Sequence, residues 1–222
     1  MQFRYARRRA CVTHPAPLAR GFYYGAKFMK KVAILIDGGH TRVLVRKANK
    51  RYDPNYIEQL ARAAIDKEEE DIVRILYYDC PPFNGRVKLP VSGDVKEYNG
   101  SGVWLDDLAE RDLFAVRRGI LKFRGFVPRK VPVAREALTD DDFEPRFEQK
   151  DVDMRIGLDI ATYADNRSID RFVIFTADTD CIPAFKHARK LGLQVVLVDL
   201  PDGKLVGELR QHADYVRRVE LP

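Results

Sequence analysis

The sequence predicts an α/β fold of three layers, in which helices cover both faces of a central, mostly parallel sheet. Short apolar runs with the length and branching of buried strands, such as Val32–Ile36 and Gln194–Val198, alternate with segments of helical period, such as Tyr56–Ile65. Alternation of this kind is typical of parallel sheets built from strand–helix–strand units. With 222 residues, the chain is long enough for one such domain with a full core.

The first half of the domain is predicted to contain two buried strands separated by a helix. Val32–Ile36 is a continuous apolar run, and Ile72–Tyr78 is a second run that ends before Pro81-Pro82. Between them, Tyr56–Ile65 has apolar residues at helical spacing after the start signal Asp53-Pro54. These elements form the first strand–helix–strand unit.

The middle of the chain contains mostly turn signals. Asn84-Gly85, Ser92-Gly93 and Asn99-Gly100 predict an inserted, mobile loop over about residues 80–103, bordering the functional site. Three further elements are expected before residue 150: a short helix over Trp104–Arg111, a strand or hairpin over Phe114–Phe123 around Arg118-Gly119, and a charged loop over Thr139–Gln149.

The second half returns to strand–helix alternation. The first element is a helix over Val152–Tyr163, with Met154, Leu158 and Ala161 on one face and Ile156 and Ile160 nearby. A strand over Phe172–Phe175 and a helix over Ile182–Leu191, closed by Gly192, follow it. The last elements are a strand over Gln194–Val198, a helix over Leu205–His212 and a strand over Tyr215–Val219. The domain is therefore expected to span residues 29–222.

Residues 1–28 are expected to be a basic, disordered extension. Residues 1–31 hold eight Lys and Arg and no Asp or Glu, and removing these charges from the net +6 leaves −2 for residues 32–222. A slightly acidic body argues against generic binding of nucleic acid through net charge. The extension is open to three interpretations: an Arg-rich targeting peptide, a basic arm for nucleic acid, or sequence upstream of a natural start at Met29.

The cysteines, the histidines and the hydropathy indicate a reduced, cytoplasmic protein without a membrane contact. Cys11, Cys80 and Cys181 lie far apart, and Cys80 and Cys181 are expected to be buried thiols. The four histidines are scattered, so a zinc site is not expected. No apolar run approaches the roughly 20 residues that span a bilayer.

Acidic residues stand where predicted strands end or helices begin. Asp37 follows the first strand and precedes Gly38-Gly39, Asp178 follows a later strand, Asp180 opens the next helix, and Asp153 lies in the first turn of its helix. The active crevice of an open parallel sheet lies beyond the carboxyl ends of its strands. Each acid could instead be only a helix cap or a partner of the helix dipole.

Grouped carboxylates at this edge predict a site for a hard divalent cation. Asp178 and Asp180 are two residues apart, and a cation would remove the repulsion between them. Such cations commonly serve phosphate chemistry. Asp159 projects from another side of its helix than Asp153, so it is expected either to support the ion's ligands from behind or to be a structural hydrogen-bond acceptor.

Three stretches together resemble a known family. Val32–His40 is a strand followed by Ile-Asp-Gly-Gly, Lys150–Asp159 contains Lys-x-Val-Asp and a later Asp, and Phe175–Ile182 contains the D-x-D turn. With the closing stretch Leu205–Val219, they resemble the NYN domain, a branch of the PIN-like nuclease fold, and in particular its bacterial LabA-like members. The resemblance extends from about Lys31 to the C-terminus.

The resemblance implies a metal-dependent ribonuclease with a PIN-like strand order. The acids that would surround Mg²⁺ or Mn²⁺ and serve catalysis are Asp37, Asp153, Asp178 and Asp180. The sequence departs from the family at three places: His40 stands where many relatives carry Asn or another small polar residue, Asp151 replaces the usual Gly, and Thr176-Ala177 replaces Ser-Gly.

Substrate contacts are predicted at His40, Lys150, Thr176 and Arg118. Lys150 could also be only a salt-bridge partner, and Thr176 could orient Asp178 or simply end its strand. The basic residues Arg117, Arg118, Lys122, Arg124, Arg129 and Lys130 are interleaved with Phe114, Phe123 and Phe126. This mixture suits phosphates and stacked bases, although alternating charge on a solvated strand is the commoner explanation.

We therefore expect a Mg²⁺- or Mn²⁺-dependent endoribonuclease whose partner is RNA. The alternative is a non-catalytic regulatory or RNA-binding module that acts through partners. A phosphatase-like hydrolase is disfavoured, because Gly39 stands where a second Asp would follow Asp37. Association into a homodimer, through an edge strand or an outer helix, is left open.

Overall fold

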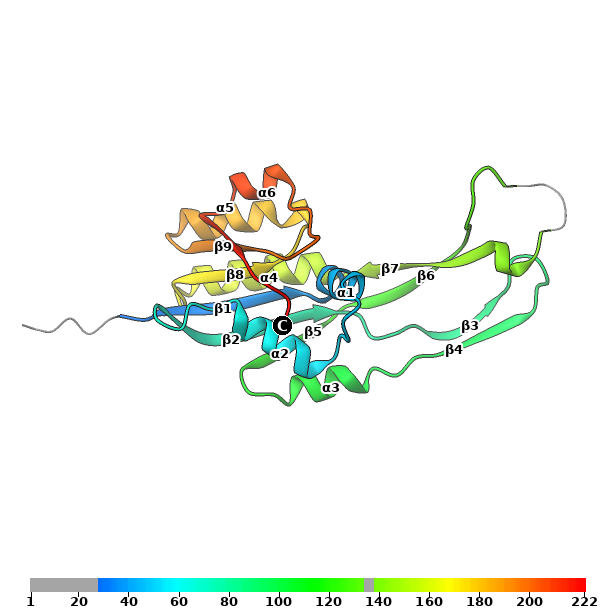
Figure 1. Cartoon of the computed structure of the whole chain (residues 1–222), viewed down its shortest axis with the longest axis horizontal. Coiled ribbons are helices and arrows are strands. Elements are labelled where there is room, and N and C mark those ends of the chain that lie inside the picture. Colours follow the sequence, from blue (N-terminus) through cyan, green and yellow to red (C-terminus); the bar gives the residue numbers. More distant parts are fainter. Residues whose placement is uncertain (1–27, 134–137) are drawn as a thin grey trace, which may run out of the picture.

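The α/β prediction is confirmed by a computed structural model that describes residues 28–133 and 138–222 (Figure 1). A six-stranded sheet, parallel throughout, has the order β10-β9-β8-β1-β2-β5. Its strands are β1 (Lys30–Asp37), β2 (Glu70–Asp79), β5 (Phe114–Arg118), β8 (Arg171–Phe175), β9 (Gln194–Asp199) and β10 (Tyr215–Arg218). The extension predicted over residues 1–28 falls almost wholly outside the described residues.

Helices cover both faces of this sheet. They are α1 (Gly38–Lys47), α2 (Pro54–Ala63), α3 (Val103–Ala109), α4 (Val152–Asp165), α5 (Ile182–Lys190) and α6 (Gly207–Gln211). The first three pack on one face and the last three on the other, which gives three layers (Figure 1). None of the described helices has the length and apolarity that a membrane span requires.

Strand β1 shows why the central run is apolar throughout. Val32, Ile34 and Ile36 contribute to the core under α1, α2 and α3, whereas Ala33 and Leu35 contribute to the core under α4, α5 and α6. All five side chains are at most 1% exposed. A strand buried on both faces has no polar alternation, which is the pattern that the sequence shows.

The register brings three strand ends to one edge of the sheet. Asp37 at the end of β1 pairs with Tyr78 of β2, and Ile36 pairs with Phe175 at the end of β8. The chain runs from β1 to β2 on one side and later places β8 on the other side of β1. The carboxyl end of β1 is therefore at a topological switch point, where ligands of open α/β sheets bind.

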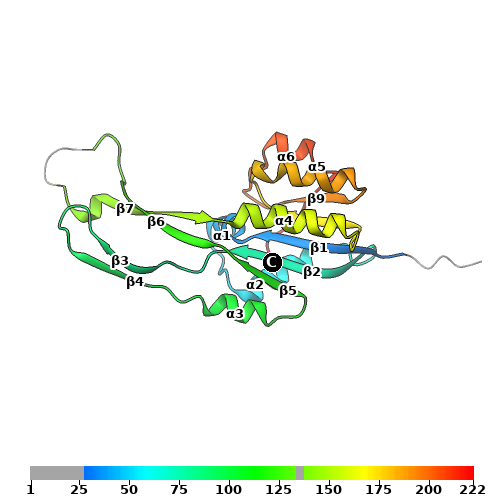
Figure 2. The ribbon, with the colours of Figure 1, turned by 180° about the vertical axis from the view of Figure 1, so that it is seen from behind.

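Two antiparallel hairpins extend beyond this edge and together form what we call the arm (Figures 1 and 2). One pairs β3 (Asn84–Lys88) with β4 (Val95–Asn99), and the other pairs β6 (Ile120–Pro128) with β7 (Phe143–Lys150). Phe147 joins them, because its ring centroid lies 5.5 Å from that of Phe83, 5.7 Å from that of Tyr98 and 5.8 Å from that of Phe123.

The arm corrects two loop predictions, and of the strand or hairpin expected over Phe114–Phe123 only the strand alternative holds. Residues 83–103 contain β3 and β4, and residues 139–149 contain most of β7 after a short 3₁₀ turn at Asp140–Asp142. Phe114–Phe123 does not form a hairpin: β5 pairs with β2 in the main sheet, whereas β6 pairs with β7. The paired strands are rich in charged residues, so they lack the apolar period that predicts a strand.

The helix expected over Val152–Tyr163 is confirmed as α4, and the structure decides which of its faces is buried. Val152, Ile156, Ile160 and Ala164 are buried, whereas Met154 is 71% and Leu158 is 61% exposed. The helix carries two apolar stripes, and spacing alone does not tell which of them meets the sheet.

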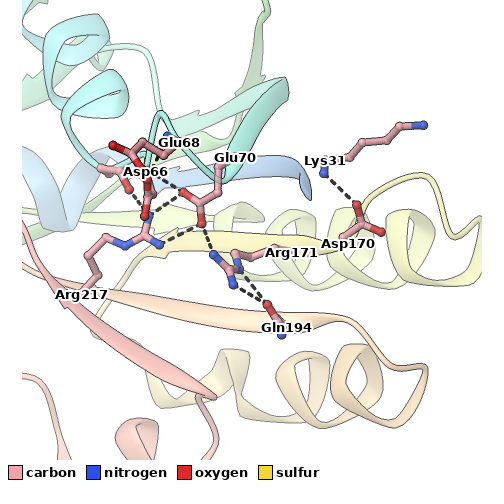
Figure 3. Close-up of polar contacts among 9 residues, drawn as sticks. Lys31, Asp66, Glu68, Glu70, Asp170, Arg171, Gln194 and Arg217 are labelled. Carbon is pink, nitrogen blue, oxygen red and sulfur yellow. Dashed lines mark hydrogen bonds and ion pairs between the residues drawn. The ribbon is translucent and has the colours of Figure 1, made fainter. Parts of the chain in front are cut away.

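At the amino ends of the strands, an ion network ties the sheet together (Figure 3). Glu70, only 3% exposed, accepts hydrogen bonds from both Nη atoms of Arg217 at 2.8 Å and one from Arg171. Burial alone would raise the pKa of Glu70, but the bonds from Arg217, Arg171 and the Asp66 backbone amide outweigh it and lower the pKa to about 2. The network lies at the edge opposite Asp37.

Candidate functional site

Asp37 occupies the turn between β1 and α1. Its carboxylate Oδ1 accepts a hydrogen bond from the His40 backbone amide at 3.1 Å and so caps α1, while its carbonyl accepts one from Thr41 Oγ1 at 2.7 Å. Burial, followed by the charges of Asp153 and Asp79, raises the pKa of Asp37 to about 6 although the amides of His40 and Gly39 lower it. Asp37 is thus both a helix cap and an acid held among other acids.

Gly38 and Gly39 allow this turn to lie close against its neighbours. A Cβ at Gly38 would overlap the Tyr77 hydroxyl and lie 2.7 Å from Asp79 Oδ2. A Cβ at Gly39 would lie 2.8 Å from Gln149 Oε1. No larger residue fits the turn without displacing the groups around Asp37.

Asp153, Asp178 and Asp180 approach from the other side of β1. Burial, followed by the charge of Asp178, a hydrogen bond with its carboxylate and the charge of Asp180, raises the pKa of Asp153. Asp178 Oδ1 accepts from the Asp180 amide at 2.9 Å, and the Asp178 amide donates to Thr176 Oγ1 at 3.1 Å. These bonds fix the turn that presents Asp178 to Asp153.

The structure brings the four predicted acids into one neighbourhood at the carboxyl edge of the sheet. Neighbouring carboxylates repel one another unless a proton or a cation lies between them, and carboxylate oxygens are the ligands that Mg²⁺ and Mn²⁺ prefer. The chemistry of these donors therefore suits such an ion. Within residues 28–133 and 138–222, no three His, Cys, Asp or Glu side chains form a complete ion-binding cluster, so metal binding stays a prediction.

Asp79, at the end of β2, is a site residue that sequence reasoning missed. It is fully buried and accepts hydrogen bonds from Arg42 at 2.5 and 3.1 Å, from Tyr77 Oη at 3.0 Å and from the Cys80 amide at 2.8 Å. Gln149 Nε2 donates a further bond at 3.3 Å. The signal was available, since β2, like β1, is an apolar run that stops at Asp.

Two of the four predicted substrate contacts lie beside the acids but have positions that limit their roles. Thr176 is fully buried, so its hydroxyl holds the Asp178 turn and has no surface for substrate. His40 is half-buried, and burial lowers the pKa of its imidazole. Its backbone amide caps Asp37, whereas a role of its ring with substrate stays a prediction.

The predicted basic residues are largely engaged with acids. Lys150 pairs with Glu148 at 2.5 Å, and Arg118 pairs with Asp106. The other pairs are Arg117 with Asp159 at 2.9 Å, Arg124 with Glu148, and Arg129 with Glu144 at 3.7 Å. Phe114 lies in the core, and Phe123 and Phe126 lie in the arm. The structure therefore favours the salt-bridge interpretation of Lys150, and it pairs these arginines with acids as well.

Two structural predictions around the site are confirmed. Asp159 accepts hydrogen bonds from Tyr78 Oη and Arg117 Nε, both at 2.9 Å, and so acts as a structural acceptor. Cys80 and Cys181 are buried free thiols. Cys11 lies outside the described residues.

Known proteins similar to this chain support its fold more than its activity. A solved structure of a protein of unknown function, VPA0982 from Vibrio parahaemolyticus, superposes with a TM-score of 0.50 at 16% identity, covering 87% of this chain and 95% of that one. An uncharacterized protein of Methanocaldococcus jannaschii, MJ0482, is 31% identical over 84 residues. That match covers 38% of this chain and 35% of the relative.

The family model for the NYN domain matches residues 31–220, which include all four acids and both flanking helix layers. This match agrees with the all-parallel sheet and with the grouping of the acids at its carboxyl edge. The chain belongs to the NYN domain family, a branch of the PIN-like nucleases.

Proposed function

We propose that this protein is a LabA-like NYN ribonuclease that hydrolyses RNA phosphodiester bonds with Mg²⁺ or Mn²⁺. The observation that carries the proposal is the grouping of Asp153 and Asp178 near half-buried Asp37, at the topological switch point of the parallel sheet. Acids gathered at such an edge with raised pKa values are typical of functional sites.

Asp37, Asp153 and Asp178 would hold the ion, and Asp180 would complete the set or hold a water. When bound, the ion neutralises charge on the phosphate and lowers the pKa of water. The chain's own contribution is to position the acids. The His40 amide fixes Asp37, Thr176 and the Asp180 amide fix Asp178, and the first turn of α4 holds Asp153.

Calorimetric titration with Mn²⁺ tests the site. Asp178→Asn removes one carboxylate with little change in shape, and Asp71→Asn, on the exposed amino half of β2, is the matched control. We expect binding by the wild type and by Asp71→Asn, and loss of affinity by about 10-fold or more in Asp178→Asn. Equal heats for all three proteins would reject the site.

A second candidate is a non-catalytic module that retains the fold and acts through partners. The observation in its favour is that five of the predicted RNA-contacting cations are already paired with carboxylates. Clear Mn²⁺ binding without cleavage of single-stranded or structured RNA would support this candidate over the enzyme.

A further inference from the structure

We propose that a pocket next to the acids binds one nucleotide of the RNA strand, with its phosphate on arginines and its base against aromatic rings. The pocket, which we call the arginine pocket, is lined by Arg42, Arg46, Arg51, Tyr52, Trp104 and Asp107, among others, and has a volume of about 640 Å³. This inference rests on the proposed function, because it assigns the place where substrate lies beside the site.

The arginine pocket is related to the acid site through Arg42, which lines the pocket and contacts Asp79. Arg42 and Arg46 are one turn apart on α1 and therefore share a face of that helix. The guanidinium of Arg42 lies on Asp79, which in turn lies against the Gly38 turn that follows Asp37. A strand whose phosphate lies at the acids can thus place its next nucleotide in the pocket.

Positive charge remains available at the wall of the pocket. Asp79 accepts from Arg42 through both Nη atoms, which uses two of the five N–H groups of the guanidinium. Arg51 pairs with Asp53 at 3.1 Å, whereas Arg46 is exposed and forms no ion pair within the described part of the chain. Arg46 is therefore the cation best placed to take a phosphate, for which the guanidinium fork is suited.

The two aromatic rings are held in place by contacts that continue to Asp79. Tyr52 Oη lies 3.1 Å from Tyr77 Oη, which donates to Asp79 Oδ2 at 3.0 Å. Trp104 meets Tyr77 edge to face, with centroids 6.0 Å apart. Both rings are half-buried, so each keeps a surface for a ligand. Fixed aromatic rings beside arginines are the combination that holds single-stranded nucleic acid without regard to base.

The balance of charge limits the ligand to a short one. Asp53 and Asp107 also line the arginine pocket and Asp79 pairs with Arg42, so the three guanidinium groups are opposed by three carboxylates. A long polyanion would find little net attraction there, whereas a single phosphate beside a base fits both the charge and the volume. A second hollow of about 630 Å³ lies at the amino edge of the sheet, includes Arg167 in its lining and is remote from the acids.

Trp104 is the only tryptophan of the chain, so its fluorescence reports directly on the pocket. The full chain carrying Asp37→Asn, which prevents cleavage, is titrated in EDTA with a single-stranded hexaribonucleotide. We expect the emission of Trp104 to change on binding. Arg46→Glu should raise the Kd by about 10-fold or more. Trp104→Ala should raise the Kd to a similar extent, which is measured by the anisotropy of a labelled strand because this variant lacks the tryptophan.

The matched control is Arg167→Glu, an equal charge reversal in the other hollow, which should leave the Kd within about twofold. Arg46 is exposed, so its variant is expected to fold even if Trp104→Ala does not. The inference is overturned if the strand does not bind, if Arg46→Glu binds as the parent does, or if Arg167→Glu weakens binding equally.

Failure of the ribonuclease proposal would look different. A protein that neither binds Mn²⁺ nor cleaves RNA, but whose Trp104 signal and Kd depend on Arg46, would retain the arginine pocket without the enzyme. A protein that cleaves RNA with a Kd indifferent to Arg46 and Trp104 would retain the enzyme without the arginine pocket.

Discussion

Arg42 on α1 and Asp79 at the end of β2 form a two-pronged ion pair, with N–O distances of 2.5 and 3.1 Å, directly behind the Gly38 turn. Asp79 is fully buried, whereas the side chain of Arg42 is 24% exposed. The pair joins the acid site to the arginine pocket, and it fixes the position of both.

Arg42→Ala is expected to leave Asp79 buried without its counter-ion. Breaking a buried pair from one side costs about 3 kcal/mol or more of unfolding free energy. Urea unfolding measures this cost. The control is Arg51→Ala, because the side chain of Arg51 is 88% exposed and its pair with Asp53 contributes less than about 1 kcal/mol. A loss at Arg42 no larger than at Arg51 would contradict the assigned role.

Gly38→Ala is expected to destabilise the protein, whereas Gly157→Ala is not. The Cβ at Gly38 would overlap the Tyr77 hydroxyl and crowd Asp79, at a cost of about 1–3 kcal/mol. Gly157 lies within α4, and a Cβ there meets nothing within 4 Å, so alanine should stabilise the helix by up to about 1 kcal/mol. Thermal unfolding should show a lower Tm for Gly38→Ala and an unchanged or higher Tm for Gly157→Ala. Equal changes in Tm for the two variants would show that a Cβ at Gly38 can be accommodated.

The Glu70 network predicts a loss of stability in acid. The pKa of Glu70 is about 2 in the folded protein and 4.5 ordinarily. A lowered folded-state pKa contributes stability that is fully present above pH 4.5 and is lost as the pH falls towards 2. The contribution amounts to about 3 kcal/mol.

Glu70→Gln removes the titrating group and keeps its shape. The difference in unfolding free energy between wild type and Glu70→Gln should therefore shrink as the pH falls from 5 to 2. Denaturant titrations at several pH values measure it. A difference that does not vary with pH would mean that Glu70 is not held ionised by Arg171 and Arg217.

Phe147→Ala is expected to uncouple the two hairpins of the arm. Phe147 touches Phe83, Tyr98 and Phe123, so truncation removes the shared contacts of β3–β4 with β6–β7. An aromatic residue that is only half-buried should cost about 2 kcal/mol, below the 3–5 kcal/mol of a core phenylalanine. Hydrogen exchange should speed up in Asn84–Asn99 and stay slow in β1. Unchanged exchange in β3 and β4 would show that other contacts hold the arm.

The parallel sheet could be predicted from the sequence because buried strands leave a strong signal. The apolar run ending at Asp37 and the one ending at Phe175 are each bounded by turn residues, and the structure confirms both strands. The run ending at Asp79 carried the same signal. None of the motifs that carry the family resemblance includes Asp79.

The arm could not be predicted, because its stability comes from contacts distant in sequence. Phe83 and Phe147 meet only after the two hairpins have formed and come together. The strands of the hairpins contain many charged residues and few apolar ones, a pattern that predicts a solvated loop. The pairing of basic residues with Asp106, Glu148 and Asp159 also cannot be predicted from the sequence. These ion pairs engage basic residues that the sequence suggested for RNA contact.

Cleavage of a single-stranded RNA by the full chain, with Mn²⁺ or with EDTA, tests the proposed ribonuclease activity directly when wild type, Asp37→Asn and Asp71→Asn are compared. We expect cleavage by the wild type and Asp71→Asn only with Mn²⁺, and a rate at least about 100-fold lower for Asp37→Asn. Equal cleavage by wild type and Asp37→Asn, or cleavage that persists in EDTA, would contradict it.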